Sequence, residues 1–131
     1  MIRIISIGKL REKYFIEACD EYLKRLTKYT KVEMIEAKNV DSALKQAKGV
    51  LVLLDEKGEQ QDSEKFAQFI KEKDITFIIG PAEGFNDKEK NKASHLLSLS
   101  KMTFPHQMAK LFLVEQIYRA STILKNENYH K

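Results

Sequence analysis

Polar and ionisable side chains concentrate in the last third of the chain, at both ends of one long apolar segment. The run SLSKMTFPHQ, residues 98–107, precedes that segment and supplies three hydroxyls and His106. Glu115 and Arg119 lie inside the segment, four residues apart. An aromatic ring, an imidazole and a cation follow it: Tyr129, His130 and Lys131. Side chains of these types can transfer protons, stabilise a developing anion or stack on an unpaired base.

Each of these features also has a simpler structural interpretation. A Glu115 and Arg119 pair at this spacing is usually a solvated helix contact worth about 0.2–0.5 kcal/mol. His106 could contact a phosphate or orient a cofactor, but the residues alone favour a hydrogen bond within the core. A polar terminus that follows Asn126 is ordinarily frayed. The residue types therefore leave a catalytic and a structural interpretation open.

The run before the apolar segment has an unusual composition for a loop. Hydroxyl side chains interleave with apolar ones over residues 98–104, a stretch that contains no glycine. A simple surface loop is usually richer in glycine. The pattern predicts a partly buried wall beside the apolar segment.

Hydrophobic periodicity predicts alternating strands and helices ahead of this region. A β-branched run at 2–7 predicts a strand, and the apolar runs at 50–54 and 75–79 are typical of strands in a parallel sheet that is covered on both faces. Apolar residues three and four apart predict an amphipathic helix over 12–28. The pattern indicates a parallel α/β fold. Further predicted elements are a strand at 31–37, a short helix at 41–48, a helix capped by Asp62 or Ser63, a helix from Asn86 to Leu96 or Leu97, a strand around Leu99 and a helix from Pro105 to Lys125.

Two of these strands end in turns that could bind a ligand. Leu54 and Asp55 end one strand, and the sequence GPAEG, residues 80–84, follows another. Ligands bind at the carboxyl edge of parallel sheets, and Gly80 permits a close approach of the backbone. An ordinary strand-to-helix turn explains the same residues more simply. The spacing matches neither GxGxxG nor a P-loop, so neither a dinucleotide site nor an NTP site is supported.

Composition indicates one globular domain over residues 1–131. With 43% hydrophobic residues in 131, the chain can bury one core, and its net charge of +4 favours a polyanionic partner. No apolar run approaches the roughly 20 residues that span a bilayer, and no signal-peptide pattern opens the sequence, so we expect a cytoplasmic protein without a membrane partner. Cys19 is the only cysteine, which excludes an internal disulfide and a cysteine-based zinc site.

The segment from Pro105 to Lys125 is apolar around most of its helical circumference. Such a helix needs neighbours on more than one side. In a chain this small we expect its own sheet on one side and a second subunit on the other, which predicts a homodimer.

Six ordered motifs along the chain carry a resemblance to one family. They are Gly8-Lys9-Leu10 after the first strand, LDEKG at 54–58, IIGPAEG at 78–84, SLSKMTFPHQ at 98–107, LVEQIYRA at 113–120 and the closing YHK. In this order the motifs resemble those of the SPOUT class of RNA methyltransferases, and within it the RlmH (YbeA-like) family.

The resemblance implies a parallel α/β fold with a C-terminal deep trefoil knot, assembled as a homodimer. It implies that RNA is contacted by His106, Arg119, Tyr129, His130 and Lys131. The sequence departs from the family at Pro81, where a second glycine is common and where proline removes an amide donor, and in a shorter segment between Ala37 and Gly49. The implied cofactor is S-adenosylmethionine, bound by Leu54, Gly80, Leu99, Ser100, Lys101, Met102, Thr103 and Phe104.

The implied function is methyl transfer to N3 of a pseudouridine in 23S ribosomal RNA within the assembled ribosome. We expect no metal, because an in-line displacement with a good leaving group needs mainly positioning and help with loss of the N3 proton. His130, or a water it holds, could accept that proton, Arg119 could stabilise the developing anion, and Tyr129 completes the catalytic set. Two other classes stay open: a non-catalytic ribosome-binding or RNA-binding module with the same fold, and a flavodoxin-like small-molecule binder.

Overall fold

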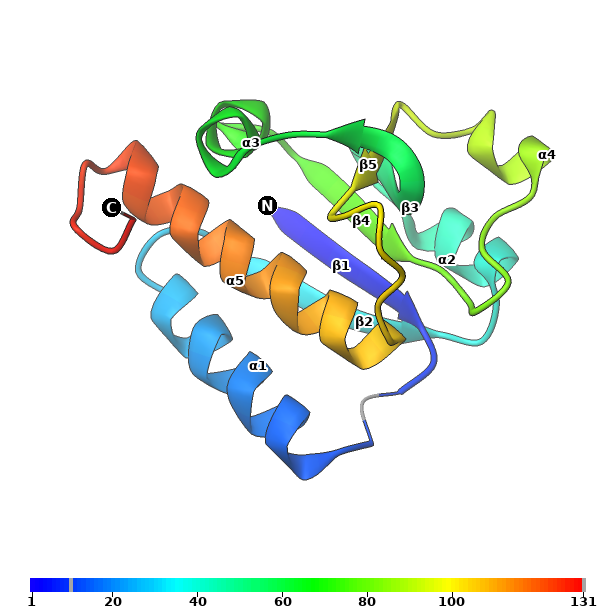
Figure 1. The fold of residues 1–131 in the computed structure, drawn as a ribbon, viewed down its shortest axis with the longest axis horizontal. Coiled ribbons are helices and arrows are strands. Elements are labelled where there is room, and N and C mark those ends of the chain that lie inside the picture. The colour runs from blue at the N-terminus through cyan, green and yellow to red at the C-terminus, as the bar shows by residue number, and fades with distance from the viewer. Residues whose placement is uncertain (10, 131) are drawn as a thin grey trace.

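The computed structural model describes residues 1–9 and 11–130. Along the chain they form β1 (Ile2–Ile7), α1 (Lys13–Leu26), β2 (Val32–Ala37), α2 (Val40–Gln46), β3 (Val50–Gln60), α3 (Ser63–Ile70), β4 (Ile75–Ile79), α4 (Asp87–Lys90), β5 (His95–Ser98) and α5 (His106–Leu124). The strands make one sheet in the order β2-β1-β4-β3-β5, and all neighbouring strands are parallel (Figure 1). The predicted parallel α/β fold is confirmed.

The two faces of the sheet bury separate cores, because successive residues of a strand point to opposite faces. On one face, Ile4 and Phe77 pack with residues of α1, α3 and α5. On the other face, Ile5 and Ile78 pack with residues of α2 and with Phe85. All five residues of β4 are buried, including Thr76, as the mainly apolar run at 75–79 predicted.

Two predicted helix starts are confirmed by their side-chain caps. The Asp62 carboxylate accepts a hydrogen bond from the Lys65 amide at 2.7 Å, at the beginning of α3. Asn86 and Glu89 form a reciprocal capping box at the beginning of α4, with bonds of 2.7 and 2.8 Å.

The predicted extent of the helix after Asn86 is wrong. α4 ends at Lys90, and the chain enters β5 at His95, so the strand expected around Leu99 lies at 95–98 instead. The Ser94 amide donates to the Leu51 carbonyl, and the Ser94 hydroxyl accepts from the Leu51 amide. Pairing with the open edge of β3 therefore overrides the local helical pattern.

β3 is longer than the predicted 50–54 and irregular in its second half. Leu97 of β5 pairs with both Leu54 and Glu59, so the residues between them bulge out of the ladder. A Cβ at Gly58 would lie 2.6 Å from the Leu96 backbone. Glycine at this position therefore permits the close approach of the two strands.

The apolar circumference of α5 is covered differently from the expectation. α5 lies between α1 and α3 and against the sheet (Figure 1), so the chain's own helices cover sides that we assigned to a second subunit. Large apolar side chains stay exposed near its first half, where Phe112 is 38% and Met102 is 75% exposed. The exposed apolar side chains that support a homodimer are therefore confined to the N-terminal end of α5.

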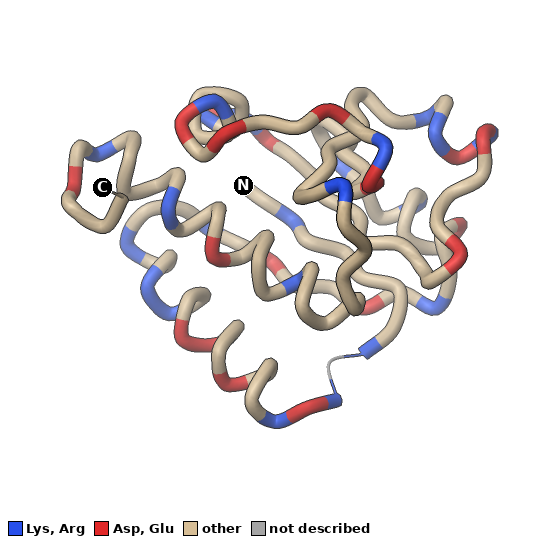
Figure 2. The backbone as a smooth tube through the Cα atoms, viewed as in Figure 1, with Lys and Arg blue, Asp and Glu red and all other residues tan. Residues whose placement is uncertain are grey.

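Charged groups lie mainly on the outer helices and loops, whereas α5 carries only Lys110, Glu115 and Arg119 (Figure 2). Within residues 1–9 and 11–130, none of the helices combines the length and apolar character that crossing a bilayer requires. In the same part of the chain, no three His, Cys, Asp or Glu side chains come together as metal ligands would.

Candidate active site

The segments predicted to bind a cofactor meet at one edge of the sheet. Leu54 pairs with Ile79 on one side and with Leu97 on the other, so the end of β4, the middle of β3 and the end of β5 lie side by side. Gly80 and the loop that begins at Leu99 therefore leave the sheet at neighbouring positions. The structure places the three segments together at a carboxyl edge, where parallel sheets bind ligands.

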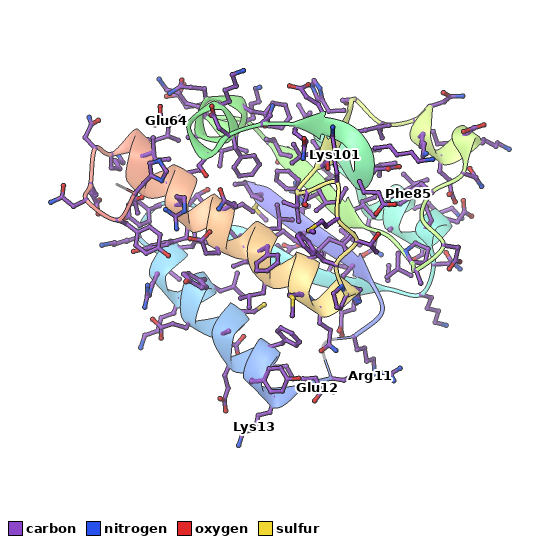
Figure 3. All side chains as sticks on the ribbon, viewed as in Figure 1. Arg11, Glu12, Lys13, Glu64, Phe85 and Lys101 are labelled. Carbon is purple, nitrogen blue, oxygen red and sulfur yellow. The ribbon has the colours of Figure 1, made fainter. Side chains whose placement is uncertain are left out.

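Gly80 is required for close packing at this edge. A Cβ at Gly80 would lie 2.7 Å from Cζ of Phe85, whose ring is 8% exposed (Figure 3). The space beside Gly80, which we expected to be kept for an adenosine, is thus filled by an aromatic ring of the same loop. Gly84 differs, because its φ of +78° lies in the left-handed region and its Cβ position is open.

The loop of residues 99–105 is held by its own hydroxyl groups. The Ser98 hydroxyl donates to the Ser100 carbonyl at 2.9 Å, and the Ser100 hydroxyl accepts from the Met102 amide at 3.0 Å. Thr103 donates to the Glu56 carboxylate at 2.6 Å. The predicted wall is correct at Ser98, which is buried, but Met102 and Thr103 are exposed, as is Lys101, which lies on the outside of the loop (Figure 3).

A cavity of about 600 Å³ joins this loop to the C-terminal tail. One wall is apolar, and it includes Leu99 and Phe104 of the predicted cofactor set. Other lining residues are polar, among them Glu115 and His130. The other residues that line it are Gln61, Asp62, Ser63, Glu64, Phe66, Leu97, Ser98, Phe112 and Gln116.

The tail reaches the cavity because the chain reverses directly after α5. Asn126 adopts φ +56°, its amide donates to the Ile123 carbonyl at 3.0 Å, and the Glu127 amide donates to the Thr122 carbonyl at 2.9 Å. This pair of bonds around a left-handed residue is a Schellman motif. It directs residues 128–130 back along α5, so the segment that we would ordinarily expect to be frayed is folded.

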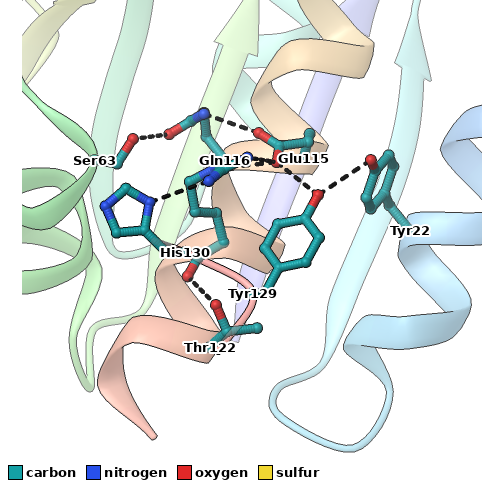
Figure 4. Close-up of polar contacts among 8 residues, drawn as sticks. Tyr22, Ser63, Glu115, Gln116, Thr122, Tyr129 and His130 are labelled. Carbon is teal, nitrogen blue, oxygen red and sulfur yellow. Dashed lines mark hydrogen bonds and ion pairs between the residues drawn. The ribbon is translucent and has the colours of Figure 1, made fainter. Parts of the chain in front are cut away.

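Glu115 is the centre of a hydrogen-bond network that receives the tail (Figure 4). Its Oε2 accepts from Arg119 Nε at 3.1 Å, from Arg119 Nη2 at 2.8 Å and from the Tyr129 hydroxyl at 2.9 Å. The Tyr129 hydroxyl also lies 3.3 Å from that of Tyr22 on α1. The bond to Glu115 raises the pKa of Arg119, and burial raises that of Tyr129 well above its ordinary value, with further contributions from Tyr22 and Glu115.

Arg119, Tyr129 and His130, the predicted catalytic set, are thus brought together. Arg119 Nη1 lies 3.0 Å from His130 Nδ1, and the guanidinium carbon lies 4.9 Å from the centre of the Tyr129 ring. Tyr118 packs edge-on against the same ring, with centroids 4.7 Å apart. Lys131, the fourth predicted residue of the tail, lies outside the described residues.

His106 is separated from this group. It precedes Arg119 by 13 residues of α5, which is about 20 Å along a helix axis. The half-buried imidazole packs against Gly8, and its Nε2 is buried without a partner among the described residues. Burial, followed by the nearby charge of Lys110, lowers the pKa of His106. Within one chain, the predicted RNA-binding residues therefore form two groups.

Sequence reasoning missed several residues of these groups. It treated Glu115 only as the partner of Arg119, and it gave no role to Tyr22, which comes from a distant helix that no local spacing could connect with the tail. It also missed Lys110, which is 3% exposed and donates to the Ser6 hydroxyl at 3.3 Å. Burial lowers the pKa of Lys110. Lys110 lies four residues after His106, and this spacing could have indicated that the two side chains share one face of the helix.

A family model described as "Predicted SPOUT methyltransferase" matches residues 1–130 of this chain. The chain belongs to the SPOUT methyltransferase family. A ribosomal RNA large subunit methyltransferase H from Caldicellulosiruptor bescii is 41% identical, and the alignment covers 100% of both chains. A protein of the same name from Trichlorobacter lovleyi is 43% identical over 98% of both chains. The resemblance inferred from the six motifs is confirmed.

Solved structures show the same fold. A methylase family protein from Haemophilus influenzae superposes with a TM-score of 0.65 at 13% identity, covering 99% of this SPOUT chain and 70% of the other. The SpoU methyltransferase AviRb from Streptomyces viridochromogenes, solved with AdoMet, has a TM-score of 0.57 at 10% identity, covering 98% of this chain and 59% of its own. At these identities the likeness concerns the fold.

Proposed function

We propose that this protein is an S-adenosylmethionine-dependent methyltransferase of large-subunit ribosomal RNA, and that it methylates N3 of a pseudouridine in 23S rRNA within the assembled ribosome. The observation that carries the proposal is the full-length identity of 41% with a relative named ribosomal RNA large subunit methyltransferase H. The cavity between the 99–105 loop and the tail supports it. Acting on ribosomes, the protein would work in the cytoplasm.

The residues present fit the cofactor. The cavity volume of about 600 Å³ lies in the range of small-molecule sites. The apolar lining at Leu99 and Phe104 suits an adenine ring, and the polar lining includes the carboxylate of Glu64, which can face a cationic group. Leu54, Gly80 and residues 100–103 complete the proposed set at the adjoining sheet edge. The bound cofactor supplies an electrophilic methyl group on a sulfonium.

The chain's own residues would position the acceptor nucleotide at the tail. His130 lines the cavity, whereas Tyr129 is held behind it by Glu115 and Tyr22. Arg119 places a positive charge beside the imidazole, with Nη1 3.0 Å from Nδ1 of His130. A preorganised group of this kind lowers the barrier by holding donors where charge develops.

The separation of His106 from the tail supports a homodimer in which two subunits share one nucleotide. Two groups about 20 Å apart on one helix cannot both contact a single base, but the tail of one subunit could approach His106 of its partner. The exposed Phe112 and Met102 lie at the end of α5 that would then be covered. Light scattering should give close to twice 15.2 kDa, and a stable, active monomer would contradict the proposal.

Ribosomal RNA from a strain that lacks the protein tests the activity. Mass spectrometry should show loss of one methyl group from one pseudouridine of 23S rRNA, and the purified protein should restore it with labelled S-adenosylmethionine. Calorimetry should show that the protein binds the cofactor. RNA binding without methyl transfer would instead indicate the non-catalytic module, and binding of a flavin alone would indicate the small-molecule binder.

A further inference from the structure

The contact between Arg119 and His130 determines where the imidazole proton lies. Arg119 Nη1 and His130 Nδ1 are 3.0 Å apart. A guanidinium carries only donors, so it must be the donor in this bond. Nδ1 must therefore accept, and the proton of the ring must lie on Nε2.

Arg119 cannot easily turn away from this contact, because Glu115 holds it by two bonds. Nε and Nη2 of Arg119 donate to the same carboxylate oxygen at 3.1 and 2.8 Å, and the two side chains are only 27% and 17% exposed. The other oxygen of Glu115 accepts from Gln116 at 2.8 Å, and Gln116 accepts from the Ser63 hydroxyl at 2.7 Å. One chain of bonds therefore runs from α3 through α5 to the tail (Figure 4).

His130 lines the cavity, and Nε2 is the ring nitrogen that Arg119 does not contact. The ring belongs to the cavity wall together with Ser63 and Glu64 of α3. Its Nε2 lies 3.8 Å from a carboxylate oxygen of Glu64, which is too far for a hydrogen bond. The Nε2 proton thus stays available to a molecule in the cavity.

We propose that Glu115 and Arg119 are positioning residues that keep Nδ1 of His130 engaged as a hydrogen-bond acceptor. His130 then serves methyl transfer as an Nε2–H hydrogen-bond donor to the nucleotide and not as its base. This inference rests on the proposed function. It reverses the role that the sequence suggested for His130, since neither ring nitrogen has a free lone pair in this arrangement. It also gives Arg119 an indirect role.

The role fits the electron flow of the reaction. The N3 proton leaves to a water molecule, the N3 electron pair forms the new bond to the methyl carbon, and the carbon–sulfur bond breaks with its electron pair going to sulfur. Loss of the proton places negative charge on the carbonyl oxygens that flank N3. A fixed N–H beside one of these oxygens stabilises the charge as it develops, and removing one such donor typically lowers turnover about 100- to 1000-fold.

Nitrogen NMR tests the tautomer without any need for activity. In a long-range proton–nitrogen spectrum of the free protein, the ring signals absent from a His130→Gln variant identify His130. We expect a proton-bearing Nε2 and a bare Nδ1 in the wild type, and a mixture of tautomers in Arg119→Lys, whose single ammonium cannot hold both Glu115 and His130. A proton on Nδ1 in the wild type would overturn the inference.

Two matched substitutions of His130 test the role in transfer. Glutamine places an amide N–H near the Nε2 position and cannot titrate, whereas asparagine places it near Nδ1. We expect His130→Gln to lose less than about tenfold in kcat and His130→Asn to lose about 100-fold, with an unchanged affinity for S-adenosylmethionine. If the two variants are equally inactive, His130 does not act as this donor.

The pH dependence of transfer separates a donor from a base. Among the residues that the structure describes, the ionisable groups around His130 are Glu64 on α3, Glu115 and Arg119 on α5, and Glu127 and Tyr129 in the tail. We expect His130→Gln to keep the rising limb of the wild-type kcat profile, because a proton acceptor other than the imidazole sets it. Loss of that limb would show that His130 is the base. A wild-type protein that methylates no ribosome would overturn the proposed function itself. If the wild type is active and only His130→Gln loses the rising limb, this inference alone is overturned.

Discussion

The two ends of α5 use the same kinds of side chain in opposite ways. At the C-terminal end, one oxygen of Glu115 accepts three hydrogen bonds, and the tail is held from two helices. At the N-terminal end, Nε2 of His106 is buried without a partner among the described residues, and Lys110 is buried with a single bond of 3.3 Å. The neighbouring Met102 is 75% exposed.

The difference indicates which end is complete within one chain. Buried polar groups in native proteins are normally paired, so an unpaired imidazole nitrogen marks a place where a bound molecule or a second subunit can contribute. A satisfied network needs no such partner and is rigid before the substrate arrives. We therefore expect substitutions at the C-terminal end to affect transfer, and substitutions near the other end to affect binding.

Deleting residues 129–131 should produce the largest effect. We expect methyl transfer to fall by roughly 100-fold or more, because the deletion removes His130 and releases Arg119. The free energy of unfolding should also fall, by about 2 kcal/mol, since Tyr129 is half-buried and bonded to Glu115 and Tyr22. Labelled transfer to ribosomes and urea unfolding measure the two quantities. The sequence alone suggested almost no loss of stability.

The matched control for the deletion is Tyr129→Phe. It keeps the ring that packs on Tyr118 and Arg119 but removes both hydroxyl bonds, so about 1 kcal/mol of stability should be lost. Cofactor affinity should be unchanged in both variants. A parallel loss of cofactor binding would mean that the tail supports the whole cavity, and full activity of the deletion would remove the tail from the site.

Gly80→Val should have the next largest effect, and it should appear in cofactor binding. A branched side chain would displace the Phe85 ring, which lies 2.7 Å from the Cβ position, and the sheet edge would rearrange. We expect affinity for S-adenosylmethionine to fall at least about tenfold, with roughly 1–3 kcal/mol of stability lost. Calorimetry and urea unfolding provide the readouts.

Gly84→Ala is the control that separates crowding from backbone strain. It adds a methyl group in open space at φ +78°, so it should lose about 1 kcal/mol of stability with little effect on the affinity. Gly80→Ala combined with Phe85→Leu should recover part of the lost binding. Unchanged affinity in Gly80→Val would place the cofactor elsewhere.

The same contrast explains what could be predicted from the sequence. Runs rich in apolar residues predicted the three central strands, and the Asn86 and Glu89 spacing predicted a cap, because both signals are local. The predicted end of that helix was wrong, because Ser94 pairs with Leu51 of β3, more than 40 residues earlier in the chain. Local spacing also predicted the Glu115 and Arg119 contact, but not its importance.

The functional role of the tail was predicted only through the family resemblance. No pattern in the sequence indicated that Tyr22 would meet Tyr129, since 107 residues separate them. The turn at Asn126 was a local signal that could have been used, because asparagine directly after a helix often takes the left-handed conformation. The knot is likewise not encoded in any local spacing, whereas the second subunit was inferred from the apolar circumference of the 105–125 helix, and both stay predictions.

Asn126→Val should have a smaller effect than either change above. A β-branched residue at φ +56° should lose roughly 1–2 kcal/mol of stability and shift the direction of the tail, so transfer should fall several-fold. Asn126→Gly should leave both quantities within a few tenths of a kcal/mol. Glu72→Val provides a matched strain at φ +55° far from the tail, and it should lower stability without a specific loss of transfer. Equal effects on transfer from the two valines would contradict a directing role for Asn126.

The smallest effect concerns pH and tests the unpaired end of α5. Burial, and then Lys110, lowers the pKa of His106 below its ordinary 6.5 in the folded protein. Between these two values the unfolded chain binds more protons than the folded chain, so stability rises with pH across that window. Stability should accordingly decrease as the pH falls below 6.5, until the folded pKa is passed. The pKa of Lys110 is also lowered by burial, but from an ordinary value of 10.5, so its contribution changes at higher pH. Urea unfolding of the wild type and of His106→Gln at pH 7.5 and pH 5 isolates the imidazole, because carboxylates contribute equally to both proteins. We expect the wild type to lose more stability than the variant on acidification. An equal loss would show that His106 is solvated when charged, and the contrast between the two ends of α5 would then rest on Lys110 alone.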